Sequence, residues 1–224
     1  MQIIWKGQSC FQIISSTGKN NHVSIVVDPY EEGIGLRVPK LEADILLVTH
    51  KHSDHNNVKA VSAASPEESK SPFLIDGPGE YEIKEVFVQG ISSWHDDKEG
   101  KEQGENTIYT IETEELKLCH LGDIGQKEIT DEQLEQIGEV DVLMIPVGGV
   151  GTISAKEAVN IMSQIEPKIT IPMHYQIPKL NKKIDGVDKF LKAVGVKSVQ
   201  PISKLTIKKK DVSEEEAKII VLEP

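Results

Sequence analysis

Short strand-like runs of hydrophobic residues alternate with turn residues through the first half of the chain. The turns are rich in glycine, proline, asparagine and aspartate, which separate strands in proteins built mainly from sheet. The predicted strands cover residues 2–5, 10–15, 23–28, 44–49, 72–75, 81–89, 107–112 and 116–121.

Helical spacing of apolar residues is clearest in the second half, where two capping boxes mark expected helix starts. One begins at Ser154 and Glu157, and a second lies in the run that starts at Thr130. The apolar residues on the expected inner faces are Leu134, Ile137, Ala158, Ile161, Met162, Ile165, Val187, Phe190, Leu191 and Val194. Strands are predicted over 142–145, 169–173, 205–207 and 218–222, with a polar turn over 211–216.

This order of elements predicts a mixed α/β (α+β) fold in which two sheets pack together and helices lie outside them. In such a four-layer αββα sandwich each sheet buries one face on the other sheet and one face under helices. The segment 96–105 is too hydrophilic to be buried, and we expect an exposed loop there. Because no linker rich in proline or glycine divides the chain, we predict one domain over residues 1–224.

Composition excludes several classes of function. The chain has 224 residues with 38% hydrophobic and 27% charged, typical of a globular protein, and its apolar runs are too short to span a bilayer. The start of the sequence lacks a charged leader with an apolar stretch, so we expect a cytoplasmic protein with no membrane partner. We expect Cys10 and Cys119 to be reduced thiols.

Charge argues against a nucleic-acid partner. The formal net charge is −11 and Arg37 is the only arginine, so the surface is expected to repel a polyphosphate backbone. We interpret the basic run 208–210 as the solvated end of a strand. A small-molecule substrate fits this composition better.

The most informative segment is H-x-H-x-D-H at residues 50–55, directly after the apolar run 45–49. Its three imidazoles and one carboxylate crowd a loop at the carboxyl end of a predicted core strand, where ligands gather in open α/β sheets. A solvated histidine-rich turn is the alternative, but ordering such a loop costs side-chain entropy that metal binding would offset. We therefore predict a metal site.

Three isolated residues follow other predicted strands: His95, Asp123 and His174. Each alone would be an ordinary half-buried histidine or a turn residue. The loop at 50–55 needs further ligands to complete its coordination, and these three have the right chemistry.

With these motifs in this order, the chain resembles the metallo-β-lactamase-fold superfamily of metal-dependent hydrolases over nearly its whole length. The runs G-x-S-C-F at 7–11, G-P-G-E-Y at 77–81 and P-M-H-Y at 172–175 resemble most the branch that contains the L-ascorbate-6-phosphate lactonase. The resemblance implies two metal sites that share one bridging ligand. The first site would comprise His50, His52 and His95, the second Asp54, His55 and His174, with Asp123 as the bridge.

Such a site would hold two divalent ions, with zinc expected and manganese or iron as alternatives for nitrogen and oxygen donors. The ions would bind a water molecule and acidify it into a nucleophile. Asp54 would orient that water and pass its proton to the leaving group. Asp28 matches an aspartate that ends an early strand in the family. It is interpreted as holding the ligand loop, with a turn-starting role before Pro29 as the alternative.

Substrate contacts are expected from a few nearby residues. Tyr175 could donate to a developing oxyanion, although it could equally pack in the core. Arg37 and Lys51 are the local cations for a phosphate-bearing substrate. A glycine-rich turn at 148–151 would let the backbone approach a ligand closely, or would serve only as a strand–helix turn.

Departures from related groups narrow the function. Gln8 stands where this branch often has histidine, and Asn56 and Asn57 replace the glycine pattern of the glyoxalase II group. His52 disagrees with the glutamate of the flavodiiron reductases, and the second site lacks the cysteine of zinc β-lactamases. We therefore predict a hydrolase for a small ester, lactone or phosphoester. A metal-stabilised binding or sensing module without turnover, or a nuclease with a basic groove, are the alternatives.

Overall fold

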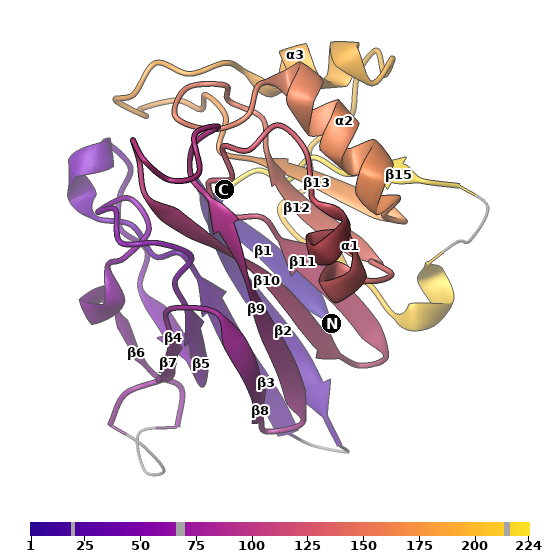
Figure 1. The fold of residues 1–224 in the computed structure, drawn as a ribbon. Helices are drawn as coiled ribbons and strands as arrows, with labels where there is room; N and C mark the ends of the chain where they lie inside the picture. Colours follow the sequence, from indigo (N-terminus) through magenta and orange to yellow (C-terminus); the bar gives the residue numbers. More distant parts are fainter. Residues whose placement is uncertain (19–20, 66–69, 213–215) are drawn as a thin grey trace.

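A computed structural model of the chain describes residues 1–18, 21–65, 70–212 and 216–224. Two mixed sheets face each other across a continuous hydrophobic core (Figure 1). The N-terminal sheet has the strand order β14-β1-β2-β3-β5-β7, and the C-terminal sheet has the order β15-β13-β12-β11-β10-β9-β8. The α+β class and the sandwich predicted from the sequence are confirmed.

The N-terminal sheet is antiparallel from β14 to β3 and parallel from β3 to β7. Its strands are β1 (Gln2–Gly7), β2 (Cys10–Thr17), β3 (Asn21–Val27), β5 (Ile45–Leu47), β7 (Phe73–Ile75) and β14 (Leu205–Thr206). Alternate residues of β1 and β2 face the core, which explains why their runs alternate in the sequence.

The C-terminal sheet changes from antiparallel to parallel at β11. Its strands are β8 (Gly79–Ile83), β9 (Val86–Trp94), β10 (Glu105–Thr113), β11 (Leu116–His120), β12 (Val142–Pro146), β13 (Ile169–Met173) and β15 (Lys218–Ile219). Every residue of β12 and β13 is buried, because helices cover their outer face and the other sheet covers their inner face.

The helices α1 (Asp131–Ile137), α2 (Ala155–Ile165) and α3 (Val187–Ala193) lie on the outer side of the C-terminal sheet (Figure 1). Both predicted capping boxes are present, at Thr130 with Gln133 and at Ser154 with Glu157. None of the helices formed by the described residues has the length and apolar character needed to cross a bilayer.

The outer face of the N-terminal sheet has a thinner cover than the other sheet. Short 3-10 turns at Glu32–Ile34 and Val58–Ala60 and the two-stranded pair of β4 (Leu41–Ala43) and β6 (Val61–Ala63) lie there. Together with the sheet they enclose a second small core. It contains Cys10, Val26, Tyr30, Leu41, Ala43, Leu46 and Val61.

One predicted strand is wrong in detail. The run 81–89 is not one strand but the hairpin of β8 and β9, and its turn residues Lys84 and Glu85 have φ values of 51° and 64°. Hairpins with two positive φ values usually carry asparagine, aspartate or glycine at the turn, and the absence of that signal concealed this one. The predicted polar turn over 211–216 lies partly outside the described residues; Asp211 ends a short 3-10 turn at Lys209–Asp211.

The loop predicted to be wholly exposed contains one buried residue, Asp96, whose side chain organises the rest. Its carboxylate accepts four backbone N–H groups, from Lys98, Gly100, Glu102 and Gln103, at 2.7–2.9 Å. These hydrogen bonds lower the pKa of Asp96 to about 2. The prediction failed at this position because a carboxylate surrounded by backbone donors does not need water.

The two sheets are joined where their strands end by Tyr109 of β10. Its buried hydroxyl donates to the carbonyl of Val48, just beyond β5, at 2.9 Å and to that of Ile75, the last residue of β7, at 3.2 Å. The loops that follow β3, β5, β11 and β13 meet at this end of the sandwich, and they carry the candidate ligands.

Replacing Tyr109 with phenylalanine is expected to lower the free energy of unfolding by about 1–3 kcal/mol, because the buried hydrogen bonds of its hydroxyl are lost. The Ile75 carbonyl keeps the Val48 N–H as a donor, so the main loss is at the Val48 carbonyl. Urea denaturation measures the change. Tyr81→Phe, at a half-buried position on an edge strand, is the control and should stay within about 0.5 kcal/mol of wild type. Equal effects of the two variants would contradict the role given to Tyr109.

Asp96→Asn is expected to lower the melting temperature at pH 7. The pKa of Asp96 is depressed in the fold, so its ionised form stabilises the protein above the ordinary pKa of about 3.9 and loses that effect as the pH falls through about 2. The difference in melting temperature between Asp96→Asn and wild type, measured with a chelator present, should therefore become smaller below about pH 4. Asp97→Asn is the control, since Asp97 pairs at the surface with the exposed Lys127. A melting-temperature difference between Asp96→Asn and wild type that does not change with pH would contradict this account.

Candidate metal centre

The segment 49–55 is held in place by Asp28, at the end of β3. The Asp28 backbone, with φ 49°, donates to the carbonyl of Leu47. Its buried carboxylate accepts the Thr49 N–H and the Thr49 hydroxyl, both at 2.8 Å, and lies 2.9 Å from Nδ1 of His55. The two ends of the loop are therefore tied to one carboxylate, which is the holding role interpreted from the sequence.

These bonds also set which ring nitrogen faces the centre. Because the Thr49 hydroxyl donates to Asp28, it accepts from Nδ1 of His50, 2.9 Å away. Nδ1 of His55 donates to Asp28. In the neutral form of each ring, the lone pair therefore lies on Nε2, which is the atom that would bind a metal ion.

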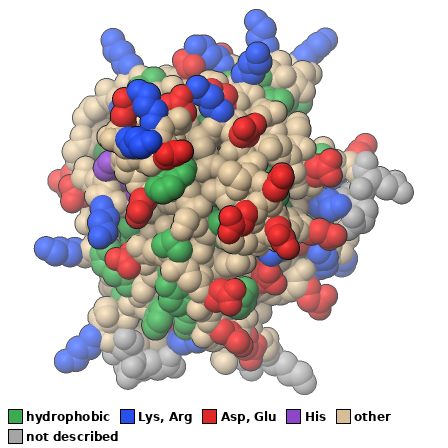
Figure 2. Space-filling view, viewed as in Figure 1, with side chains coloured by type: hydrophobic (Ala, Val, Ile, Leu, Met, Phe, Trp, Pro, Cys, Tyr) green, Lys and Arg blue, Asp and Glu red, His purple; other side chains and the backbone are tan. Residues whose placement is uncertain are grey.

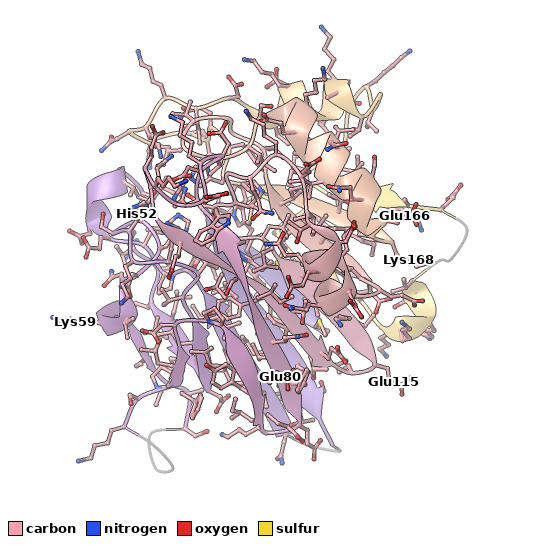
Figure 3. All side chains as sticks on the ribbon, in the orientation of Figure 1. His52, Lys59, Glu80, Glu115, Glu166 and Lys168 are labelled. Atoms are coloured by element: carbon pink, nitrogen blue, oxygen red, sulfur yellow. The ribbon has the colours of Figure 1, made fainter. Side chains whose placement is uncertain are left out.

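Three histidines form the first candidate group: His50, His52 and His95, each offering a nitrogen within 4.8 Å of the others. Their ring centroids lie 4.6–4.9 Å apart. His50 and His95 are buried, whereas His52 is exposed and opens the group to solvent. In Figure 3 His52 lies near one end of the sandwich and Glu115, in the β10–β11 turn, near the other.

The second candidate group is Asp54, His55, Asp123 and His174, again with ligand atoms within 4.8 Å. Oδ2 of Asp123 lies 3.1 Å from Nε2 of His55 and 3.2 Å from Nε2 of His174. It also lies 3.8 Å from Nε2 of His95 in the first group. Asp123 thus has the position between the groups that a bridging ligand needs.

Several buried nitrogens here have no hydrogen-bond partner among the described residues. They are Nε2 of His50, Nε2 of His55, Nδ1 of His95, and both ring nitrogens of His174. Nε2 of His55 and Nε2 of His174 lie at ion-pair distance from Asp123, but these approaches do not have hydrogen-bond geometry. Each unpaired buried polar atom costs about 1–3 kcal/mol, so this many in one place fit a bound cation and not a packed core.

The charge states of His50, His95 and Asp123 fit the same conclusion, whereas His55 is protonated when no metal is bound. Burial lowers the pKa of His50 and of His95, so both rings are neutral donors. Burial alone would also lower the pKa of His55, but the charges of Asp123 and Asp28 outweigh it and hold that pKa well above its usual range, so a bound metal ion would have to displace the proton from Nε2 of His55. Burial would raise the pKa of Asp123, but His174 and His55 hold it well below its usual range.

Close backbone packing explains one glycine of the predicted strand–helix turn. A Cβ at Gly148 would lie 2.2 Å from the carbonyl oxygen of His174, so the chain after β12 rests directly on a candidate ligand. His174 itself has φ 49°, and its N–H donates to the carbonyl of Gln8. Gly149 and Gly151 have φ values of 74° and 76° and serve the turn.

The structure corrects one of the expected substrate contacts. The hydroxyl of Tyr175 donates to the carbonyl of Leu222 at 3.1 Å, and its ring packs 4.8 Å from that of Trp5, so it belongs to the core. Arg37 is exposed and lines a cavity of about 510 Å³ with Trp5 and Tyr175, and none of the candidate ligands is among the residues that line it. Its contact with a phosphate-bearing substrate stays a prediction. The direction of a side chain cannot be inferred from neighbours in sequence. Lys51, exposed between His50 and His52, stays a prediction.

The histidines excluded from the site have other surroundings. Nε2 of His120 donates to the Ser9 carbonyl and Nδ1 accepts the Gly122 N–H, so this buried ring is fully paired. His22 is exposed beside Ser16.

Three supporting residues were not predicted from the sequence. The Ser9 hydroxyl donates to Oδ1 of Asp123 at 3.1 Å, and the side-chain oxygen of Asn106 accepts the Asp123 N–H at 3.0 Å. Gln8, treated above only as a departure from the family, donates through Nε2 to Asp54 at 3.1 Å. The motif G-x-S-C-F pointed to the segment of Ser9 and Gln8, whereas nothing around Asn106 marked it.

Comparisons with known proteins agree with this geometry. Residues 2–174 match the model of the family described as the beta-lactamase superfamily domain. A UPF0173 protein of Pyrococcus abyssi is 31% identical over 195 residues, covering 78% of this chain and 83% of its own. A UPF0173 metal-dependent hydrolase of Thermococcus onnurineus is 27% identical, covering 78% and 84%. The crystal structure of a Thermotoga maritima protein, described as a Zn-dependent hydrolase of the metallo-β-lactamase superfamily, is 32% identical with a TM-score of 0.76, covering 99% and 97%.

Asp28→Asn should weaken metal binding by about 10–100-fold, because the amide replaces one of two carboxylate oxygens that orient the loop. Competition with a chelator measures the affinity. Asp44→Asn is the matched control and should keep wild-type metal affinity. Asp44 lies just before β5, and its carboxylate accepts hydrogen bonds from the Ser24 N–H and from Lys84, neither of which belongs to the centre. Unchanged metal affinity in Asp28→Asn would refute the holding role.

Proposed function

Because this chain belongs to the metallo-β-lactamase superfamily of metal-dependent hydrolases, we propose that it hydrolyses a small-molecule ester, lactone or phosphoester at a centre for two divalent ions. The single observation that carries this proposal is the set of buried imidazole nitrogens that lack partners around the ionised carboxylate of Asp123. Lactones are included because the motifs at 7–11, 77–81 and 172–175 resemble the lactonase branch.

Each candidate residue has a separate role in this proposal, according to its position. His50, His52 and His95 would hold one ion, and Asp54, His55 and His174 the other, with Asp123 shared. Ions bound there would lower the pKa of a water molecule toward neutrality and stabilise negative charge developing on the substrate. Asp54, whose side chain is 20% exposed, would orient the water and carry its proton to the leaving group.

The donor set favours zinc, with manganese or iron as alternatives. Neutral imidazoles and carboxylates suit all three ions, and three histidines around one ion form a known zinc arrangement. The solvent exposure of two candidate ligands supports an enzyme over a metal-stabilised binding or sensing module, because a substrate could reach them. His52 is exposed and Asp54 is partly exposed. A purely structural zinc site is normally closed by four protein ligands.

Surface charge supports a small substrate over a nucleic acid. The net charge is −11, and on the face drawn in Figure 2 acidic side chains are spread across the middle and lower right, with lysines concentrated toward the upper rim. A nuclease would need a basic groove to hold a polyphosphate strand. The cytoplasmic location and the absence of a membrane partner stay predictions.

The purified protein is expected to contain close to two divalent ions per chain and to turn over at least one substrate in a panel of p-nitrophenyl esters, lactones and phosphodiesters. Loss of a residue that only supports a ligand typically reduces activity about 10–100-fold. His52→Ala should reduce the activity further than this, since it removes a metal ligand at the exposed side of the centre. His22→Ala, at an exposed histidine outside the centre, should keep wild-type activity. A folded wild-type protein that binds no metal, or full activity in His52→Ala, would refute the proposal.

A further inference from the structure

The tight turn between β1 and β2 carries a buried amide that belongs to neither candidate ligand group. Gln8 is 1% exposed, and its backbone has φ 53°, a conformation that residues other than glycine, asparagine and aspartate rarely adopt. A long polar side chain in a strained, buried turn is costly unless its amide makes specific contacts.

The contacts of Gln8 go to the second group. Nε2 donates to Oδ2 of Asp54 at 3.1 Å, and the Gln8 carbonyl accepts the His174 N–H at 3.0 Å. The same carbonyl accepts Nε1 of Trp5 at 2.9 Å, which fixes the turn to the core. One residue therefore connects two candidate ligands of the second ion to β1.

The other end of the Gln8 amide indicates that it serves the centre and not the core. Oε1 is buried and has no hydrogen-bond partner among the described residues. An amide whose role is packing is normally paired at both atoms, because an unpaired acceptor costs free energy. Here the amide is paired only where it meets Asp54, and turning it over would place two acceptors against each other.

We propose that Gln8 is a positioning residue that acts through Asp54, holding this carboxylate in the orientation that binds the second ion. The inference rests on the proposed function and deepens it. Asp54 is partly exposed, and its Oδ2 also lies 3.8 Å from Nε2 of His55. Among the described residues, Gln8 is the side chain that donates a hydrogen bond to this carboxylate, so the Gln8 donor limits its rotation. A neutral amide does this without adding a titratable group to the centre.

The test is a titration of metal-depleted full-length protein with Co²⁺, followed by visible absorption and by competition with a chelator. Wild type should bind two equivalents. Gln8→Met keeps the length of the side chain but loses the donor, and it should bind the second equivalent about 10–100-fold more weakly with the first equivalent unchanged. Gln12→Met is the matched control, because Gln12 on β2 contacts Ser24 at 3.4 Å and not the centre; both of its affinities should equal wild type.

Gln8→Asn provides a second variant if Gln8→Met does not fold. Asparagine tolerates a positive φ, but its amide is too short to reach Asp54, so the same selective loss is expected. Wild-type affinity for both equivalents in a folded Gln8 variant would overturn the inference and leave the proposed function intact. Equal weakening of both equivalents would also overturn it, since that result indicates a general structural role. A wild-type protein that binds no Co²⁺ would overturn the proposed function, and the inference with it.

Discussion

The structure depends on one buried charge, the ionised carboxylate of Asp123, which lies between the two groups of imidazoles. A carboxylate in the interior is tolerated only beside positive charge or strong donors. Oδ1 has the Ser9 hydroxyl, while Oδ2 faces Nε2 of His55 and of His174. These rings approach Oδ2 at ion-pair distance but without hydrogen-bond geometry, an arrangement that fits the two-ion centre proposed above.

The fold brings this arrangement together from both sheets. The parallel strands β3 and β5 of one sheet end at Asp28 and the histidine loop, and β11 and β13 of the other end at Asp123 and His174. Rigid strands place the ligands, while contacts between the sheets keep the two ends in register. Tyr109 provides one such contact, and the Gln8 carbonyl, which accepts the His174 N–H, provides another.

The sequence predicted what depends on local pattern. Strands with buried faces were visible as apolar runs, and polar residues directly after them at His50, Asp123 and His174 indicated a shared edge. Contacts between distant segments were not predictable. The hydroxyl of Tyr175 turns to Leu222 and Gln8 reaches Asp54, in both cases because tertiary packing sets the side-chain direction. The carboxylate of Asp96 was missed for a different reason, because it turns to the backbone of its own loop, whose conformation the polar residues did not indicate.

The most direct test of the two-ion centre is anomalous X-ray diffraction from crystals of the metal-loaded protein, recorded on both sides of the absorption edge of the metal. The account predicts two peaks, one among His50, His52 and His95 and one among Asp54, His55 and His174, with Asp123 between them. Ions found elsewhere on the surface, or no ion at Asp123, would contradict it.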